Sequence, residues 1–145
     1  MKKSIQYNID NIEQVIRAFA LDVDKVPVVT LTGGLGAGKT TIVGSLLRHW
    51  GVGEPVSSPT FAYVNIYELC DGRIAYHFDL YRLKNLSEFE AAGFFEYLDQ
   101  PNSVVLIEWP QIVESALLGN VCRVYLEVLG SKERLITYEI ENKNG

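Results

Sequence analysis

The sequence predicts a three-layer α/β domain in which helices flank a mixed parallel and antiparallel central sheet. Three observations support this fold class. An apolar, β-branched run at 27–32 leads through a glycine-rich loop into a helical pattern, a second short apolar run lies at 104–107, and hairpin patterns occupy 60–81 and 121–141. Alternating strands and helices are typical of a parallel sheet, and hairpins add antiparallel strands. We expect residues 1–145 to form a single domain, because the sequence contains no repeat, low-complexity tract or linker.

The composition is that of an ordinary globular protein. Hydrophobic residues make up 48% and charged residues 21%, which excludes the disordered, collagen-like and coiled-coil classes. The formal net charge of −5 argues against a protein that binds nucleic acid by itself, since such binding depends on clustered Lys and Arg. The polar N-terminus and the lack of a long apolar run predict a cytoplasmic protein that makes no membrane contact. Two cysteines without a Cys-x-x-Cys spacing, Cys70 and Cys122, predict buried or half-buried thiols rather than a disulfide framework or a zinc site.

The first third of the chain reads as helix, strand and helix. A first helix is expected to begin after Asp10, with Glu13 completing a capping box. Its apolar face consists of Ile12, Val15, Ile16, Phe19 and Ala20. The run at 27–32 has no helical period and reads as a buried strand. A second helical stripe follows the glycine-rich loop and is expected to end at Gly51, a typical position for glycine after a helix.

The middle of the chain reads as a β-hairpin. Segments 60–69 and 74–81 are aromatic and β-branched, and the Asp71-Gly72 pair between them is a strong turn signal. Alternation along the second arm places His77 and Asp79 on the same face.

The last third begins with a short helix. Ser87 and Glu90 form a capping-box pattern, and Gly93 is expected to end that helix. A buried strand at 104–107 and a short helix at 111–118 follow. The chain then closes with a hairpin about a Gly130-Ser131 turn, whose arms span 121–129 and 134–141.

The most specific signal is the loop at 33–41, which contains G-x-x-x-x-G-K-[ST]. Glycines allow successive backbone N–H groups to point at phosphate oxygens, and the following helix adds its own N-terminal N–H groups. Lys39 supplies a charge for the β- and γ-phosphates, and Thr40 a hydroxyl for Mg²⁺. The motif occurs by chance in about one in 200 chains of this length, and its strand–loop–helix context favours nucleotide binding over a plain turn with a surface lysine. The expected phosphate-binding residues are Gly34, Gly36, Ala37, Gly38, Lys39, Thr40 and Thr41.

Two carboxylates are candidates for the chemistry. If the strand at 104–107 runs parallel beside 27–32, Glu108 lies at the carboxyl edge near Mg²⁺; otherwise it is a solvated strand-end residue. Asp79 contacts the metal shell or the attacking water, or else it pairs with Arg82 or a turn amide. The residues alone leave both questions open.

The remaining parts of the site are less well defined. Ser57-Ser58-Pro59-Thr60-Phe61 could reach over a γ-phosphate, with Thr60 as the candidate hydroxyl, although position alone favours an ordinary Ser-Pro turn. The sequence does not locate the adenine pocket. The segment before the first helix and the turn at 130–132, with Lys132, are the candidates.

Four strings together resemble the TsaE family (formerly YjeE) of bacterial P-loop ATPases. They occur in the family's order and spacing, and the resemblance covers nearly the whole chain. The first is shared by many ATPases, but its combination with the last two is far more specific. The strings are Gly34-Leu35-Gly36-Ala37-Gly38-Lys39-Thr40-Thr41, Ser58-Pro59-Thr60-Phe61, His77-Phe78-Asp79-Leu80-Tyr81-Arg82-Leu83 and Ile107-Glu108-Trp109-Pro110.

The resemblance implies a P-loop NTPase-like domain that helps to make threonylcarbamoyladenosine next to the anticodon of tRNAs reading codons that begin with A. It implies ATP and Mg²⁺ as cofactors and TsaB and TsaD as protein partners, with tRNA held only indirectly through that complex. TsaD transfers the threonylcarbamoyl group, and ATP turnover by the family permits repeated cycles. The family usually has an acid where this chain has Gly34. If that acid helps to orient the switch loop or a partner, its absence would alter the intrinsic hydrolysis rate or the partner contacts of this chain.

The family's functional residues carry over to matching positions of this sequence. The implied roles are phosphate binding for Lys39 and the loop backbone, Mg²⁺ binding for Thr40 and Glu108, hydrolysis for Asp79, a switch-loop hydroxyl for Thr60, and a position beside the nucleotide for Trp109.

Three functional readings are therefore compared. The first is a Mg²⁺-dependent ATPase that is weak alone, because none of the six arginines lies in the phosphate or switch strings and Arg82 is the nearest candidate. The second is a small-molecule P-loop kinase, although we find no lid-like insertion. The third is a non-enzymatic adaptor in which ATP binding orders a surface.

Overall fold

The computed structural model describes residues 2–59 and 62–142, and within them seven strands form one sheet. The strands are β1 (Lys2–Asn8), β2 (Val28–Thr32), β3 (Val64–Glu68), β4 (Ile74–Asp79), β5 (Ser103–Glu108), β6 (Asn120–Val128) and β7 (Glu133–Asn142). The α-helices are α1 (Ile12–Val23), α2 (Lys39–His49) and α3 (Leu86–Ala91). The 3₁₀ segments are η1 (Ile9–Asn11), η2 (Phe94–Asp99) and η3 (Pro110–Ala116).

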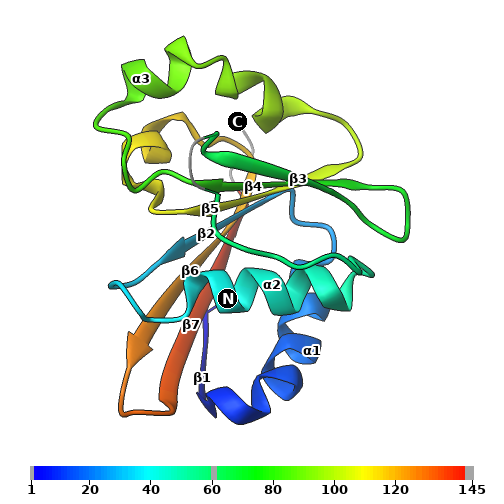
Figure 1. The fold of residues 1–145 in the computed structure, drawn as a ribbon, viewed down its shortest axis with the longest axis vertical. Helices are drawn as coiled ribbons and strands as arrows, with labels where there is room; N and C mark the ends of the chain where they lie inside the picture. The colour runs from blue at the N-terminus through cyan, green and yellow to red at the C-terminus, as the bar shows by residue number, and fades with distance from the viewer. Residues whose placement is uncertain (1, 60–61, 143–145) are drawn as a thin grey trace.

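The sheet is mixed, as the sequence predicts. Its order is β1-β7-β6-β2-β5-β4-β3 (Figure 1). The central pairs β4–β5, β5–β2 and β2–β6 are parallel, whereas β3–β4, β6–β7 and β1–β7 are antiparallel. The strand at 104–107 therefore does run parallel beside 27–32, with Leu31 opposite Glu108. This register brings the carboxyl ends of β2 and β5 to the same edge of the sheet.

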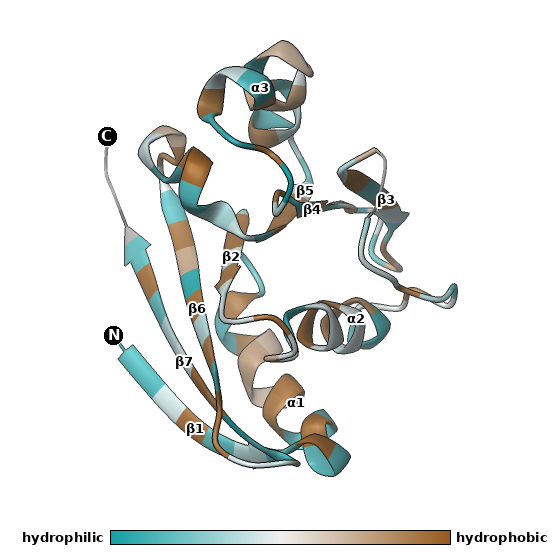
Figure 2. Ribbon diagram, turned by 60° about the vertical axis from the view of Figure 1, so that its left-hand side comes forward, coloured by the Kyte–Doolittle hydropathy of each residue, from teal (hydrophilic) through white to brown (hydrophobic). Residues whose placement is uncertain are grey.

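Two hydrophobic cores, one on each face, make the domain three-layered. Helices α1 and α2 contact each other and cover one face, where Phe19 and Leu47 are fully buried (Figure 2). Segments α3, η2 and η3 cover the other face, where Phe78 and Phe89 pack with ring centroids 5.7 Å apart. Strand β2 serves both cores, because alternate residues such as Val28 and Val29 point to opposite faces.

Both predicted capping boxes are wrong about the capping residue. Asn8, not Asp10, accepts a hydrogen bond through its side chain, from the Asp10 backbone N–H at 2.9 Å, and a turn of 3₁₀ helix precedes α1. Asn85, not Ser87, caps α3 by accepting from the backbone N–H of Glu88 at 3.0 Å. At both helix starts, two residues that commonly cap helices lie within two positions of each other. Which of them caps depends on how the preceding chain enters the helix.

Other local differences are confined to element type and edges. The segment predicted as a helix at 111–118 is the 3₁₀ segment η3, and η2 was not predicted. Strand β1, also unpredicted, alternates exposed and more buried residues and pairs only with β7, more than 120 residues away in the chain. Cys122 is buried as expected, but Cys70 is exposed because it lies in the hairpin turn after β3. None of the helices in residues 2–59 and 62–142 has the length and apolar character to cross a membrane.

The predicted end of α2 at Gly51 is confirmed, and its geometry requires glycine. Gly51 has a φ of +95°, and its N–H donates to the Arg48 carbonyl while the Val52 N–H donates to the Leu47 carbonyl. A Cβ on Gly51 would lie 2.5 Å from the Cβ of Cys70 in the hairpin turn. The helix end and the β3–β4 turn therefore approach each other closely at this point.

We expect Gly51→Ala to destabilise the fold by about 2–4 kcal/mol. Alanine is strained in the left-handed backbone conformation of this position, and its methyl group would clash with Cys70. Gly53→Ala is the matched control, since no described atom lies within 4 Å of its added Cβ, and it should change stability by no more than about 0.5 kcal/mol. Urea denaturation measures both. Equal effects of the two substitutions would contradict the assignment.

Candidate functional site

The glycine-rich loop joins the end of β2 to the start of α2. Gly36 and Gly38 have φ values of +78° and +101°, which favour glycine, and α2 begins immediately afterwards at Lys39. A Cβ on Gly33 would lie 2.8 Å from the Leu126 carbonyl oxygen, so the loop also lies close against β6. The N–H of Ala37 donates within the loop to the Gly34 carbonyl at 3.1 Å. This backbone leaves the amino end of α2 facing a cavity.

The cavity has a volume of about 330 Å³ and lies at the carboxyl edge of β2, β4 and β5. Four segments far apart in the sequence meet around it: the loop with the first turn of α2, the chain before β3, the end of β4, and the end of β5. The described residues that line it are Leu35, Gly36, Gly38, Lys39, Thr40, Thr41, Ser58, Asp79, Glu108 and Trp109. Most of the site residues that the sequence predicts are therefore brought to one place.

Lys39 is the cation of this site, and its side chain is only 5% exposed. Its ammonium donates to the carbonyl oxygens of Gly33 at 2.5 Å and Gly34 at 2.9 Å. Burial lowers the pKa of Lys39, and the negative charges of Glu108 and Asp79 partly offset that effect. The ammonium is thus held at the phosphate loop by neutral carbonyls, next to two carboxylates.

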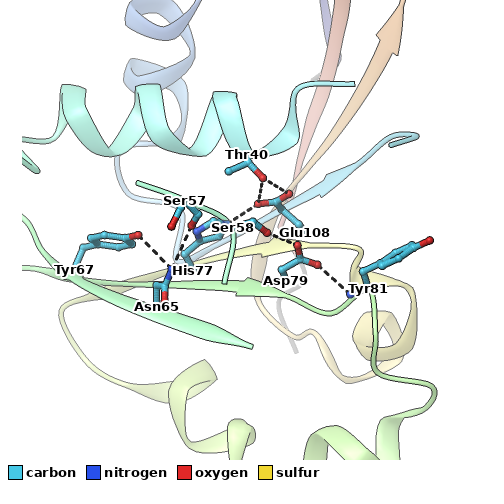
Figure 3. Close-up of polar contacts among 9 residues, drawn as sticks. All are labelled: Thr40, Ser57, Ser58, Asn65, Tyr67, His77, Asp79, Tyr81 and Glu108. Carbon is cyan, nitrogen blue, oxygen red and sulfur yellow. Dashed lines mark hydrogen bonds and ion pairs between the residues drawn. The ribbon is translucent and has the colours of Figure 1, made fainter. Parts of the chain in front are cut away.

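Thr40 and Glu108 form the oxygen cluster of the site. The Thr40 hydroxyl lies 2.9 Å from Glu108 Oε1 and 3.0 Å from Oε2 (Figure 3). Glu108 is 2% exposed, although it is the last residue of its strand. The interpretation of Glu108 as a solvated strand-end residue is therefore wrong, because the carboxylate is buried against the first turn of α2.

Asp79 lies at the end of β4, directly opposite Glu108 in the parallel register. Its Oδ2 accepts from the Ser58 hydroxyl at 2.5 Å, and its Oδ1 accepts from the Tyr81 backbone N–H at 3.0 Å (Figure 3). Asp79 therefore makes the turn-amide contact that the sequence analysis considered, and its side chain also lines the cavity. Asp79 also links the segment before β3 to the cavity, because Ser58 lines the same space.

His77 is a residue of the site that the sequence analysis did not select. It is fully buried, and its Nε2 lies 2.6 Å from Glu108 Oε2. The available signal was strand periodicity, since His77 precedes Asp79 by two residues and therefore shares its face. A histidine on the face of a candidate catalytic aspartate could have been included on that ground alone.

Trp109 adopts a left-handed backbone conformation with a φ of +57°, immediately after Glu108. The Lys39 Nζ lies 4.0 Å from the centroid of its ring, within the range of a cation–π interaction. The ring of Tyr81 lies 4.8 Å away on the side of β4. Left-handed conformations of large residues are uncommon and tend to occur at functional sites, and here the strain places an indole beside the phosphate loop.

Four predicted residues are not among those that line the cavity. Gly34 and Ala37 belong to the phosphate loop, where the Ala37 N–H donates to the Gly34 carbonyl. Thr60 lies outside the described residues. Lys132 lies in the turn between β6 and β7, where its ammonium pairs with Asp10 at 2.9 Å and its carbonyl accepts from the Ile9 backbone N–H. Lys132 is thus close to the segment before α1, which is the other candidate for the adenine pocket.

The residues present fit a magnesium-bound polyphosphate. Backbone N–H groups at the start of α2 and one buried lysine suit phosphate oxygens. A threonine hydroxyl beside a carboxylate supplies the hard oxygen ligands that Mg²⁺ takes, together with waters. Among residues 2–59 and 62–142 no group of three or more His, Cys, Asp or Glu side chains is placed to hold a metal ion.

Comparison with known proteins decides the family. The family model described as threonylcarbamoyl adenosine biosynthesis protein TsaE matches residues 7–136. The chain belongs to the TsaE family. It is 35% identical over 127 residues to the tRNA threonylcarbamoyladenosine biosynthesis protein TsaE of Rickettsia typhi, covering 87% of this chain and 86% of that protein. It is 36% identical over 128 residues to TsaE of Bacillus subtilis, covering 88% and 76% of the two chains.

A solved structure supports the same assignment. The crystal structure of Bacillus subtilis YdiB matches 99% of this chain and 89% of its own chain, with a TM-score of 0.68 and 27% sequence identity. The fold is therefore the P-loop NTPase-like α/β fold that the sequence predicts. Membership places the chain in a family that takes part in tRNA threonylcarbamoyladenosine biosynthesis.

The Lys39–Trp109 contact makes Trp109 a reporter of the cavity. If a phosphate group binds at the loop, it will compete for the Lys39 ammonium beside the indole, so adding ATP and Mg²⁺ is expected to change tryptophan fluorescence. The Trp50→Phe variant, which retains Trp109, should keep the full change, and Trp109→Phe should lose it, since Trp50 is buried in the α1–α2 core. A full signal in Trp109→Phe would contradict the assignment.

Proposed function

We propose that this chain binds ATP with Mg²⁺ and hydrolyses it as the ATPase component of tRNA N6-threonylcarbamoyladenosine modification. The observation that carries the proposal is the arrangement of Lys39, Thr40 and Glu108 at the amino end of α2, with Asp79 across the same cavity. Family membership and the P-loop-like fold support a nucleotide-binding protein. The cluster adds the groups that hydrolysis requires beyond binding.

Each side chain has a distinct role in this proposal. Lys39 and the N–H groups of the loop bind the β- and γ-phosphates, as the phosphate-loop lysine does in enzymes of this type. Thr40 and Glu108 hold Mg²⁺, which when bound neutralises charge on the phosphate oxygens. Asp79 orients the attacking water by accepting its hydrogen bond, because its carboxylate lines the cavity and, unlike that of Glu108, is not assigned to Mg²⁺. The Trp109 ring closes one side of the cavity.

We further propose that the chain acts in the cytoplasm together with TsaB and TsaD, and that tRNA is held by those partners. The formal net charge of −5 supports indirect contact with tRNA, since an acidic protein lacks the cationic surface that binds a phosphate backbone. The partners would activate hydrolysis by supplying positive charge near the phosphates, because none of the arginines lies in the phosphate or switch strings. Arg82, at the edge of a neighbouring small pocket with Ser58 and Asp79, is the arginine nearest the site in sequence.

Lys39→Ala is expected to lower ATP hydrolysis at least about 100-fold, because it removes the charge that binds the transferred phosphate. Lys25→Ala is the control, since Lys25 is exposed and lies before β2, away from the loop. Phosphate release is measured with and without added TsaB and TsaD, and with EDTA. Wild-type activity in Lys39→Ala would overturn the proposal, and a phosphorylated small molecule in place of free phosphate would favour a kinase.

Asp79→Asn separates an ATPase from an adaptor. It preserves the size of the side chain and one acceptor for the Ser58 hydroxyl while removing the charge. We expect nucleotide binding to remain within about threefold, and hydrolysis and tRNA modification to fall about 100-fold or more. Asp99→Asn, on the exposed surface of η2, is the control. Unchanged modification by Asp79→Asn would show that the chain serves as a nucleotide-dependent adaptor.

A further inference from the structure

His77 is fully buried in strand β4, although histidine is a polar residue. Strand β4 places it opposite Leu106 on β5 and Asn65 on β3. Its side chain extends toward Glu108, on the face of the sheet that α2 covers (Figure 3). A buried polar side chain in a strand centre calls for hydrogen-bond partners, since burial without them is unfavourable.

The two ring nitrogens of His77 differ in their surroundings. Nε2 lies 2.6 Å from Glu108 Oε2, whereas Nδ1 is buried and has no hydrogen-bond partner among the described residues. An ionised carboxylate only accepts hydrogen bonds, so the shared proton belongs to Nε2. A proton on Nδ1 would be buried without an acceptor. The geometry therefore selects the tautomer in which Nε2–H donates to Glu108.

The carboxylate of Glu108 is consequently held from two sides. Its Oε2 accepts from His77 Nε2–H and lies 3.0 Å from the Thr40 hydroxyl, whereas Thr40 is the described partner of Oε1, at 2.9 Å. Thr40 alone can donate to only one oxygen at a time, because its hydroxyl has a single hydrogen. The bond from His77 thus fixes which oxygen faces the strand, while both oxygens stay within 3.0 Å of the Thr40 hydroxyl.

We propose that His77 is a positioning residue for magnesium binding: it orients the Glu108 carboxylate toward Thr40 and the phosphate loop. This inference rests on the proposed function, in which Thr40 and Glu108 hold Mg²⁺. The argument is the general one for outer-shell partners of metal ligands. A ligand whose orientation is fixed beforehand loses less conformational freedom when the ion binds, and loss of such a partner typically weakens metal affinity about 10–100-fold.

The first measurement needs neither nucleotide nor metal. The ¹⁵N shifts of the imidazole nitrogens of His77, recorded in the full-length protein, report the tautomer directly. We expect a protonated Nε2 and an unprotonated Nδ1, and we expect Glu108→Gln to alter the Nε2 signal most. A protonated Nδ1 with an unprotonated Nε2 would overturn the inference, whatever the protein does with ATP.

The second measurement is the concentration of Mg²⁺ that gives half of the metal-dependent gain in ATP binding. His77→Phe removes the donor and should raise that concentration about 10–100-fold, while leaving the affinity for ATP in EDTA within about twofold. His77→Gln can place an amide N–H near Glu108 and should restore the wild-type value to within about threefold. His49→Phe, at an exposed position in α2, is the control and should match the wild type.

The outcomes separate the two levels of the proposal. If the wild type binds ATP without any dependence on Mg²⁺, the proposed function fails and the positioning role fails with it. If the wild type depends on Mg²⁺ and folded His77→Phe keeps the wild-type requirement, His77 does not position Glu108 and the proposed function stands. If His77→Phe does not fold, the imidazole shifts and the Mg²⁺ titration of His77→Gln decide the question. A His77→Gln variant whose half-maximal Mg²⁺ concentration rises more than about tenfold would contradict the inference.

Discussion

The buried carboxylate of Glu108 is the contact on which the arrangement of the site depends. It joins the end of β5 to the first turn of α2 through Thr40, and to the middle of β4 through His77. Both contacts require the parallel register in which β5 lies between β2 and β4. A shift of one residue in either pairing would turn the carboxylate to the other face of the sheet, where the second hydrophobic core lies.

Burying this group would be unfavourable in isolation. An ionised carboxylate removed from water costs several kcal/mol, and hydrogen bonds to a charged group each return about 1.5–3 kcal/mol. Glu108 has donors from two side chains and the Lys39 ammonium nearby, whose lowered pKa reflects the same burial. The cluster therefore contributes little net stability. Its physical significance is that the charges are already desolvated and oriented before any phosphate approaches, which is what makes electrostatic binding in a site effective.

The sequence predicted the fold class and the segments around the cavity, because these depend on strong local signals: apolar runs, a glycine-rich loop and turn residues. It could not decide whether Glu108 is solvated, since that depends on which strand lies beside β5. The sequence predicted caps at Asp10 and Ser87 instead of Asn8 and Asn85, because these neighbouring residues have similar capping propensities. It did not predict β1, because an edge strand that pairs only with a distant segment has little local signature. His77 was overlooked because a lone histidine has no diagnostic motif.

The position of the cavity follows from the course of the chain more than from any single residue. From β2 the chain passes into α2, on the face covered by the first core, whereas from β5 it passes into η3, whose Val113 lies in the second core. Adjacent parallel strands thus send their chains to opposite faces, and the ends of such strands separate to leave a crevice at the carboxyl edge. Lys39 begins α2 on one departing segment, whereas Glu108 ends β5 and Trp109 begins the other departing segment. The left-handed backbone of Trp109 is the turn by which the second chain leaves the sheet, so the strain there accompanies the divergence that opens the site.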